Sequence, residues 1–438
     1  MKTLLNKALE VCDAVEIYRR TVSNVSVDMK FSEIQSVDSS LKTEIALRLI
    51  KGNQMGTAVA TSLEDETLIE RALTSLKHQN SEAVTFLNEP ITEVMCYSEP
   101  LEALSLDAMV ALVHRYNAIF SELDQTMDTA IGLEKTAKEV EILNSNGFNE
   151  VYRYTNLESS IGILNAQGFR SASQSFSKGN YYELNKSDFE RVYHFHKLGE
   201  TPIELGNEKM PVVFDGSVMG ALMLRVLAGV NGGNVVKGLS PLTNRLGDKI
   251  FSKILTIRDD ATYPYGCNSF RFDDEGTPAQ NTVLVEKGIL KGYLLNTKQA
   301  EKLGGLATGN SQKRNLFSKE IEDSPSIYDT NLIVEGVSIP DEDLIRGIKR
   351  GLFITGVMGA HTGNIIQGEF SLNISSGFLI EDGVFKGKVK GAMIAGNIYD
   401  LFQHVEAIGT DLKVMKSIFY NMGYAPMVLF KEAHIVGK

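Results

Sequence analysis

One almost uninterrupted apolar stretch near the middle of the chain constrains the fold more than any other feature. Residues 212–217 read Val-Val-Phe-Asp-Gly-Ser, which indicates a short strand and a turn, and Ser217 is suited to cap a helix. Between residues 218 and 230 the single charged residue is Arg225. A helix that is apolar on nearly all sides is a buried one. We therefore expect a helix inside a core, ended by the glycines at 232–233.

Arg225 leaves two interpretations of this helix open. Most apolar helices only pack against a core, whereas a few carry an active site. A guanidinium inside a protein needs an anionic or carbonyl partner. Arg225 is therefore a candidate substrate-binding residue as well as a candidate structural one.

The first half of the chain combines strand and helix patterns. Residues 24–31 alternate apolar and polar side chains, and residues 45–50 and 55–60 flank a Gly-Asn turn. Alternation with period two indicates half-buried strands. Apolar residues spaced by three and four predict helices over 1–12, 65–79, 104–123 and 187–198. Further strands are predicted near 128–136, 138–144, 149–155 and 158–175.

The second half is rich in glycine and in short strands joined by tight turns, as in the predicted hairpins at 283–295 and 377–385. Such a pattern is typical of a curved, barrel-like sheet. A chain of 438 residues is also too long for one ordinary core. We expect an α+β fold, with an N-terminal α/β domain of antiparallel sheet and helices over 1–205. A β-rich, barrel-like domain with a buried helix follows over 206–438.

Composition excludes several classes of function. The net charge is −11 and no run of Lys or Arg exceeds two residues, which disfavours direct binding to nucleic acid. No run of eighteen apolar residues would span a membrane. Cys12, Cys96 and Cys267 lie far apart without CxxC spacing, which fits a reducing compartment. The first seven residues predict the start of a helix rather than a signal peptide, so we expect a cytoplasmic protein.

No complete catalytic motif is present, but an acidic cluster stands out. Asp273, Asp274 and Glu275 are adjacent, and they could bind a cation or a substrate amine, or only shape a solvated turn. His194 and His196 are two residues apart on a predicted helix, which is a poor spacing for a metal pair. The sequence contains no HExxH motif, GxSxG motif or Walker loop.

Several stretches in the second half nevertheless resemble one family in their order. They are Val212–Gly233, Asp273–Pro278 with the hairpin Leu284–Leu295, Thr308–Asn310, Thr355–Gly359, Gly368–Ser371, the turn at Gly383, Ile394–Asn397 and Ala407–Leu412. This arrangement resembles the TldD/PmbA family, which is named for modulation of DNA gyrase and grouped with metallopeptidases. The resemblance covers nearly the whole chain and implies an α/β N-terminal domain followed by a β-rich C-terminal domain.

The resemblance also bears on zinc. The active branch, TldD, carries His-Glu, three residues and His on the apolar helix, and those positions here are Arg225, Val226 and Val230. A permanent cation and two aliphatic side chains are wrong for zinc. That branch also uses a cysteine near its C-terminus, whereas no cysteine follows Cys267 here. The chain thus resembles the PmbA (TldE) branch, without a metal or cofactor of its own and with zinc expected only in a TldD-like partner.

What the resemblance implies is a dimeric subunit, homo- or heterodimeric, of a peptidase system that degrades peptides or matures a peptide precursor. It would pair with a TldD-like metallopeptidase and shape a cleft for an unfolded peptide. Two alternatives stay open: an independent hydrolase whose ligands meet only in the fold, or an interaction protein that modulates DNA gyrase. The residues expected to contact substrate are Arg225, Asp273, Asp274, Glu275, His361 and His404.

Overall fold

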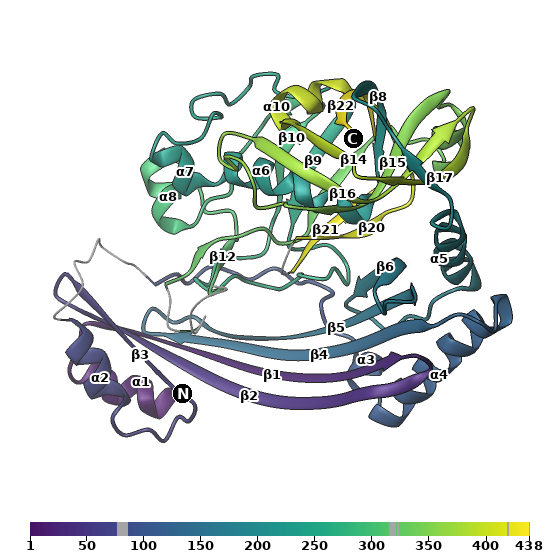
Figure 1. Ribbon diagram of the computed structural model, residues 1–438. Coiled ribbons are helices and arrows are strands. Elements are labelled where there is room, and N and C mark those ends of the chain that lie inside the picture. The colour runs from purple at the N-terminus through teal and green to yellow at the C-terminus, as the bar shows by residue number, and fades with distance from the viewer. Residues whose placement is uncertain (77–85, 315–320, 322–323, 418–419, 438) are drawn as a thin grey trace.

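The computed structural model describes residues 1–76, 86–314, 321, 324–417 and 420–437. A long curved sheet lies along one side of the molecule, and a second part rich in short strands lies across it (Figure 1). The N-terminus lies beside the long sheet and the C-terminus in the opposite part. The predicted α+β class is confirmed.

The long sheet is antiparallel, in the order β3-β2-β1-β4-β5-β6. Its strands are β1 (Ala14–Lys30), β2 (Glu33–Lys51), β3 (Gln54–Ala60), β4 (Thr129–Asn144), β5 (Asn149–Leu164) and β6 (Arg170–Lys178). The predicted turn at 52–53 joins β2 to β3, and Gly52 has a φ of 59° there. The two strands predicted at 128–136 and 138–144 are wrong as separate elements, because β4 runs through both without a break.

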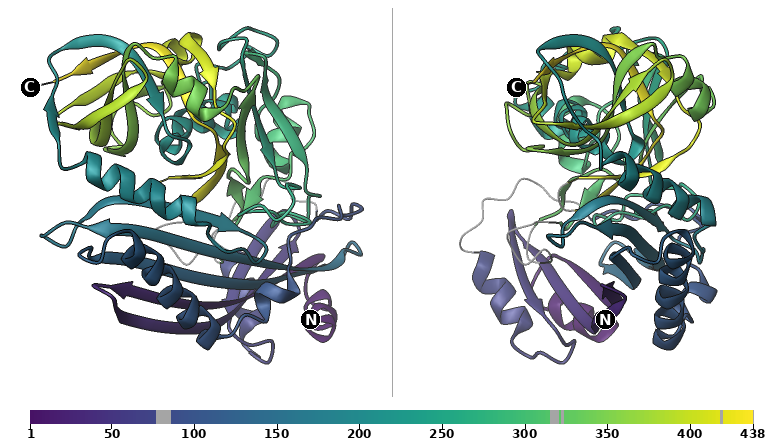
Figure 2. Two further views of the ribbon diagram at one scale, coloured as in Figure 1. Left: turned by 90° about the vertical axis from the view of Figure 1, so that its right-hand side faces the viewer. Right: turned by 45° about the vertical axis from the view of Figure 1, so that its right-hand side comes forward.

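Helices cover the two ends of one face of this sheet, as the side views show (Figure 2). They are α1 (Lys2–Leu9), α2 (Leu68–Ser75), α3 (Glu99–Glu102), α4 (Leu106–Leu123) and α5 (Lys186–Leu198). α4 begins where Ser105 Oγ accepts a hydrogen bond from the Ala108 amide. Its buried stripe, which includes Tyr116 and Phe120, packs against the sheet and α5. The helix predicted over 65–79 is shorter than expected, and residues 77–79 lie outside the described residues.

The C-terminal part contains a closed five-stranded barrel, in the order β15-β8-β22-β18-β16 with β16 paired back to β15. These strands are β8 (Glu208–Phe214), β15 (Arg350–Met358), β16 (Glu369–Glu381), β18 (Met393–Asn397) and β22 (Val428–Val436). Three short strands extend it, namely β7 (Pro202–Glu204), β17 (Val384–Lys390) and β19 (Val405–Ile408). The predicted hairpin at Gly383 joins β16 to β17, with a φ of 74° at that glycine.

A second sheet packs beside the barrel, in the order β11-β10-β9-β14-β21-β20. Its strands are β9 (Leu255–Asp260), β10 (Asn281–Glu286), β11 (Ile289–Leu290), β14 (Leu332–Gly336), β20 (Lys413–Lys416) and β21 (Asn421–Ala425). The short pair β12 (Ser311–Gln312) and β13 (Ser326–Ile327) lies nearer the long sheet. The helices here are η2 (Gly216–Val218), α6 (Gly220–Val230), α7 (Gly232–Val236), α8 (Thr297–Leu303), α9 (Asp341–Arg346), α10 (Ile398–Leu401) and η4 (Phe402–His404).

The buried helix of the sequence analysis is α6, but its predicted ends are wrong. Ser217 does not cap it, because Asp215 accepts hydrogen bonds from the Ser217 amide and hydroxyl and so caps the preceding turn η2. The glycines 232–233 do not adopt a left-handed conformation either. Instead Asn231 ends α6 and its side chain caps α7, which those glycines begin.

α6 lies in the core shared by the barrel and the second sheet. Two glycines allow close approach: a Cβ on Gly220 would lie 2.1 Å from the Lys416 carbonyl oxygen, and one on Gly229 would lie 2.2 Å from Tyr399 Oη. Leu222 and Met223 on the same helix are fully buried. Each such side chain contributes about 1.5–3 kcal/mol of hydrophobic stabilisation.

α5 and β7 link the long sheet to the barrel. Phe195 of α5 lies 4.7 Å, centroid to centroid, from the ring of Phe378 in β16. β7 pairs with β17 in parallel. The boundary at 205 falls directly after β7, and the division into two domains stays a prediction. None of the helices in the described residues is long and apolar enough to cross a membrane.

Candidate functional site

Arg225 lies on α6 with none of its surface exposed. Its Nε donates to the backbone carbonyl of Glu369 at 2.7 Å. One terminal nitrogen donates to the carbonyls of Ala221 (2.6 Å) and Ala360 (2.8 Å), and the other donates to that of Thr362 (2.7 Å). Burial lowers the pKa of Arg225, but a guanidinium stays protonated in proteins. The charge is therefore solvated by four carbonyl dipoles.

The partners of Arg225 are carbonyl groups and not the carboxylates of residues 273–275. Carbonyl oxygens of the loop between β15 and β16, of the first residue of β16 and of α6 itself occupy its donors. The physical reason is geometric: a planar guanidinium with five N–H groups can be satisfied by carbonyls that converge on it. The neighbouring Val226 and Val230 are fully buried in the core.

The acidic cluster is tied to backbone amides instead. Asp273 is 2% exposed, and its Oδ1 accepts from the amides of Glu275 and Thr277, both at 2.9 Å. Its Oδ2 accepts from the Ser311 amide at 2.9 Å. Burial, with the Glu275 charge as the next cause, raises the pKa of Asp273 well above its ordinary value. A solvated turn is therefore the wrong description of Asp273, which joins the 273–277 turn to β12.

Asp274 and Glu275 fix two further segments. Asp274 Oδ2 accepts from the Lys313 amide at 2.6 Å. Glu275 Oε2 accepts from the amide and hydroxyl of Thr297, at the start of α8. Since both carboxylates bind the protein's own backbone, their first role in this structure is to order loops.

The two histidines of the sequence analysis do not join this cluster. His361 is exposed in the loop between β15 and β16, and His404 is exposed in η4. Over the described parts of the chain, no three His, Cys, Asp or Glu side chains gather as a metal ion would need. His361, His404 and Asp274 are therefore not brought together as the ligands of an independent hydrolase.

A polar cleft lies between the long sheet and the C-terminal part. It consists of two cavities of about 190 and 480 Å³, which share Asn268 and Arg314 in their linings. We call the first cavity the aromatic end and the second the acidic end. Of the predicted site residues, Asp273 and Asp274 line the aromatic end, whereas Arg225, Glu275, His361 and His404 line neither.

The aromatic end combines rings with cations. Tyr18 and Tyr152 line it, and Lys138 Nζ lies 5.0 Å from the centroid of the Tyr154 ring and 6.0 Å from that of Tyr152. Burial lowers the pKa of Lys138. It also lowers the pKa of Lys313, to about 8, and this ammonium lies 5.6 Å from the Tyr18 ring centroid. Because burial shields these ammonium groups from water, they favour a partner with negatively charged or carbonyl oxygen atoms.

The acidic end is organised by hydrogen bonds across the two parts of the chain. Glu158 of β5 accepts from Asn421 Nδ2 at 2.6 Å and pairs with Lys416 at 3.4 Å. Burial, followed by the charges of Glu158 and Asp28, raises the pKa of Glu134 on the adjacent strand. Arg314 stacks 3.4 Å from the centroid of the Tyr420 ring at the junction of the two ends.

These cleft residues were not predicted from the sequence, although a signal existed. Every second residue of β5 from 152 to 158, namely Tyr, Tyr, Asn and Glu, faces the cleft. Their partners on β4 are Lys138, Thr136 and Glu134, opposite residues 154, 156 and 158. An alternating polar face usually indicates solvent. Only the C-terminal part, which covers that face, turns it into a cleft.

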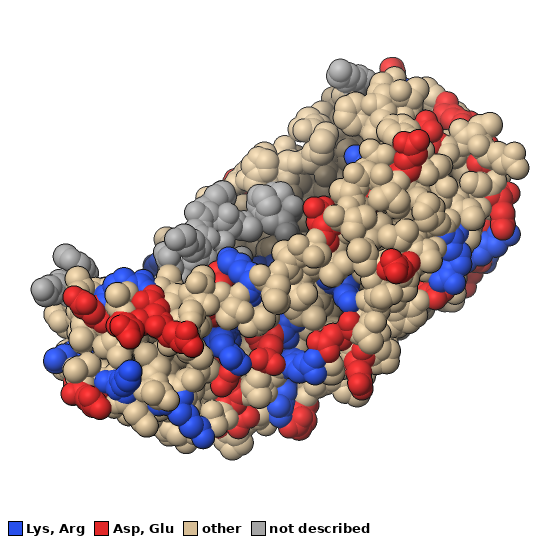
Figure 3. Space-filling view, turned by 90° about the horizontal axis from the view of Figure 1, so that it is seen from below, with Lys and Arg blue, Asp and Glu red and all other residues tan. Residues whose placement is uncertain are grey.

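The surface as seen from below carries both signs of charge, with Lys and Arg side chains interspersed among Asp and Glu (Figure 3). Among the ion pairs of the long sheet, Arg19 of β1 and Glu141 of β4 lie 2.7 Å apart, and Lys42 and Glu44, both in β2, lie 2.6 Å apart. On the face shown in Figure 3 the charges are not gathered by sign.

Comparison with known proteins identifies the family. The model of the PmbA/TldA metallopeptidase C-terminal domain matches residues 207–437, more than half of the chain. The chain belongs to the PmbA/TldD family. The matched region contains the barrel, the second sheet and α6, and the resemblance stated from the sequence is thereby confirmed.

Relatives within the PmbA/TldD family extend over the long sheet as well. The metalloprotease PmbA of Escherichia coli O157:H7 is 24% identical over 100% of this chain and 95% of its own length. A metalloprotease TldD homolog of Buchnera aphidicola is 26% identical over 84% of this chain and 80% of its own. The crystal structure of TldE from Thermococcus kodakarensis has a TM-score of 0.92, with 24% identity and complete coverage of both chains. This last likeness establishes a common fold.

Proposed function

We propose that this chain is the PmbA/TldE-type subunit of a TldD-type zinc metallopeptidase system, acting in peptide degradation or peptide-precursor maturation. One observation carries the assignment to this branch: Arg225 fills its site with four hydrogen bonds to backbone carbonyls. By the resemblance, that position is the one where the active branch carries its first zinc histidine. The arginine takes the volume that a metal site would need.

The residues at the other two motif positions do not fit zinc either. Zinc ligands supply a lone pair from nitrogen, sulfur or oxygen, and the catalytic glutamate activates a water molecule. Val226 and Val230 supply neither and are buried in the core. In the proposed system the hydrolytic step therefore belongs to the TldD-like partner.

The cleft supports a role in holding an unfolded peptide. Its aromatic end offers rings and cations, and its acidic end offers Glu134 and Glu158, so both charged and apolar peptide side chains find partners. The nitrogen atoms of the Asn268 and Asn421 carboxamides donate within the protein, but their oxygen atoms can accept from the amides of a peptide backbone. Such a lining, mixed in character, suits binding with little sequence preference.

Co-purification with a TldD-like subunit tests the assignment. The tagged chain is expressed with a TldD-like protein that retains the His-Glu, three residues, His motif, and the complex is analysed for mass, zinc and peptide hydrolysis. We expect a stable dimer of the two subunits, with the zinc bound by the partner and hydrolysis only in the complex. About one zinc per chain in this protein alone, removed by a chelator together with peptidase activity, would favour the independent hydrolase.

The gyrase-modulator alternative has its own readout. A pull-down from cell extract with the tagged chain separates the two functions, because a peptidase subunit captures a TldD-like protein whereas a modulator captures gyrase. Reconstitution with purified gyrase then serves as the control. If the chain alone changed the supercoiling activity of purified gyrase, the gyrase-modulator function would replace the peptidase assignment.

A further inference from the structure

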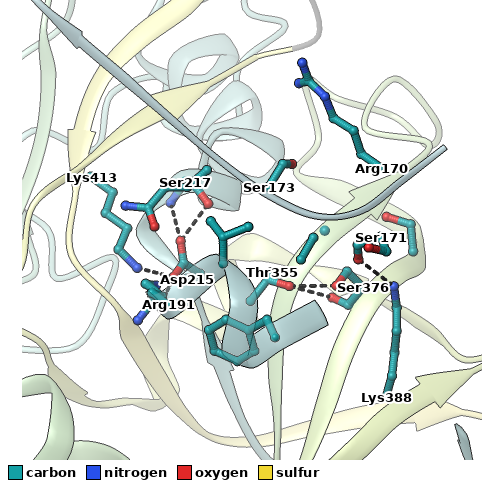
Figure 4. Close-up of a pocket in the computed structure, with 16 residues that line it drawn as sticks. Arg170, Ser171, Ser173, Arg191, Asp215, Ser217, Thr355, Ser376, Lys388 and Lys413 are labelled. Carbon is teal, nitrogen blue, oxygen red and sulfur yellow. Dashed lines mark hydrogen bonds and ion pairs between the residues drawn. The ribbon is translucent and has the colours of Figure 1, made fainter. Parts of the chain in front are cut away.

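A third cavity lies apart from the cleft, on the far side of β6 where the long sheet meets the barrel (Figure 4). Its volume is about 230 Å³, and it shares no lining residue with the two cavities of the cleft. The lining comes from β6 and α5 on one side and from β15, β16, β17 and β20 on the other. We call it the junction pocket.

The junction pocket is strongly cationic in a chain whose net charge is −11. Four cations and a single carboxylate line it, namely Arg170, Arg191, Lys388, Lys413 and Asp215. The uneven count leaves three positive charges without a counterpart in the lining.

The carboxylate accounts for only part of the charge. Asp215 Oδ2 accepts from Arg191 at 2.8 Å and from Lys413 at 2.5 Å, and its Oδ1 is taken by Ser217. Lys413, Arg191 and these hydrogen bonds hold the pKa of Asp215 well below its ordinary value, against the effect of burial. Asp215 therefore pairs with two cations, and both of its oxygen atoms are occupied, so it does not pair with Lys388 or Arg170.

Lys388 and Arg170 have no carboxylate partner in the lining, although the charge of Asp28, outside the lining, opposes the lowering of the pKa of Arg170 by burial. Lys388 Nζ donates to the Ser171 carbonyl at 3.3 Å, and Arg170 donates to Ser160 Oγ at 3.4 Å. In the part of the chain that the structure describes, neither forms an ion pair. Burial, together with the charge of Lys390, lowers the pKa of Lys388. An ammonium in this position is stabilised when an anion enters.

Hydroxyl groups complete the lining. Thr355 Oγ1 donates to Ser376 Oγ at 2.8 Å, and Ser173 and Ser375 add two more hydroxyls. Hydroxyls and ammonium groups are the side-chain donors that oxyanions accept from. Ser171 Oγ already has two partners in the protein, because it lies 3.0 Å from the Ile163 carbonyl oxygen and 2.6 Å from His196 Nδ1.

We propose that the junction pocket binds a small dianionic oxyanion, the phosphate group of inorganic phosphate or of a phosphomonoester. The excess of cations over carboxylates in the lining favours a dianion over a monocarboxylate. The anion would contact Lys388 of β17 and the hydroxyls of β6 and β16 at once, so its binding would fasten the long sheet to the barrel. This site is independent of the peptide cleft and of zinc.

Titration calorimetry on the full chain tests the proposal, at constant ionic strength because screening weakens such contacts. The probes are inorganic phosphate, phenyl phosphate as a phosphomonoester, and acetate as a monoanion. Variants are Lys388→Met, which removes a cation, and Ser173→Asp, which adds a negative charge at an exposed position of the lining. Lys386→Met, two residues earlier in β17 and exposed, is the matched control.

We expect one saturable phosphate site, with acetate at least about tenfold weaker. Both pocket variants should weaken the binding of phosphate by about tenfold or more, as loss of a charge-assisted hydrogen bond does, while Lys386→Met should leave that binding unchanged. Tighter binding of phenyl phosphate would assign the pocket to a phosphomonoester, and tighter binding of inorganic phosphate would assign it to the free ion. No saturable binding, or equal affinity in the parent, Lys388→Met and Ser173→Asp proteins, would overturn the proposal.

Discussion

Arg225 Nε donates to the Glu369 carbonyl at 2.7 Å, which ties the buried helix α6 to the first residue of β16. The same guanidinium also bonds to carbonyls within the loop between β15 and β16. That loop turns at Gly359, Gly363 and Gly368, all with φ between 84° and 89°. A loop of such shape directs its carbonyls inward, and Arg225 supplies the donors that they need.

Replacing Arg225 by Met tests this role. Met has similar length but no donor, so the carbonyls of Ala360, Thr362 and Glu369 lose their partner while the core stays filled. We expect the free energy of unfolding to fall by about 3 kcal/mol or more, because several charge-assisted hydrogen bonds are lost together. Chemical denaturation measures it. Arg245→Met, at a partly exposed arginine of the same part, is the control and should cost under about 0.5 kcal/mol.

The outcome also shows whether these carbonyls depend on Arg225 for their hydrogen bonds. If Arg225→Met were as stable as the parent, the carbonyls would be satisfied by water or by other N–H or O–H donors. Arg225→Lys should lie between the two, because an ammonium has three donors and cannot reach all four carbonyls at once.

The sequence predicted the burial of α6 because thirteen residues with one charge leave no polar face. Residues 218–230 are that stretch, and Arg225 is fully buried within it. It could not predict the partner of Arg225, since carbonyl acceptors leave no trace in side-chain patterns. The predicted ends of α6 were wrong for a related reason. Asp215 and Asn231 both cap, but which turn each one caps depends on the three-dimensional path of the chain.

The cleft residues show a second limit. Lys138 and Tyr152 follow the alternation that normally marks a solvent-facing surface, and the sheet register alone brings β4 and β5 together. Whether that face is open depends on contacts between segments more than a hundred residues apart, such as the hydrogen bond from Asn421 to Glu158. The acidic cluster was found from sequence because its three carboxylates are adjacent, yet its role as a loop organiser required coordinates.

Zinc should be dispensable for this chain. With Arg225, Val226 and Val230 on α6, we expect elemental analysis of the purified protein to find no stoichiometric zinc. A chelator should then leave the melting temperature within about 1 °C of its untreated value, because no metal-binding free energy supports the fold. The TldD-like partner treated in the same way is the positive control. A marked drop in melting temperature of this chain would reveal a metal site of its own.

Arg314 should contribute to peptide binding. It stacks on Tyr420 and lines both ends of the cleft, so a bound peptide that spans the cleft must pass it. We expect Arg314→Met to weaken binding of a labelled unfolded peptide to the complex by about tenfold, the effect of losing a central anchor. Fluorescence anisotropy measures the affinity. The exposed Arg346 of α9 provides the control as Arg346→Met; equal losses in the two variants would place the peptide elsewhere.

The buried carboxyl group of Asp329 should make the stability of the protein depend on pH. Its Oδ1 accepts from the Tyr420 hydroxyl at 2.8 Å, whereas its Oδ2 is buried without a hydrogen-bond partner in the described structure. Burial raises the pKa of Asp329 from 3.8 to about 7, against the opposing charge of Arg314 and with a further increase from Asp259. The folded protein thus holds a proton that the unfolded chain releases. Stability from this group is complete below pH 4 and is lost as the pH rises through 7.

Asp329→Asn removes that titration while keeping the shape of the side chain. We expect the variant to be close to the parent in free energy of unfolding at pH 5 and more stable than the parent at pH 8, with a change in the difference of about 2 kcal/mol. Denaturation at both pH values measures it, and Asp38→Asn, at an exposed position of β2, is the control. The sign is the decisive feature, because a carboxylate held charged by Arg314 would make Asp329→Asn less stable than the parent at both pH values.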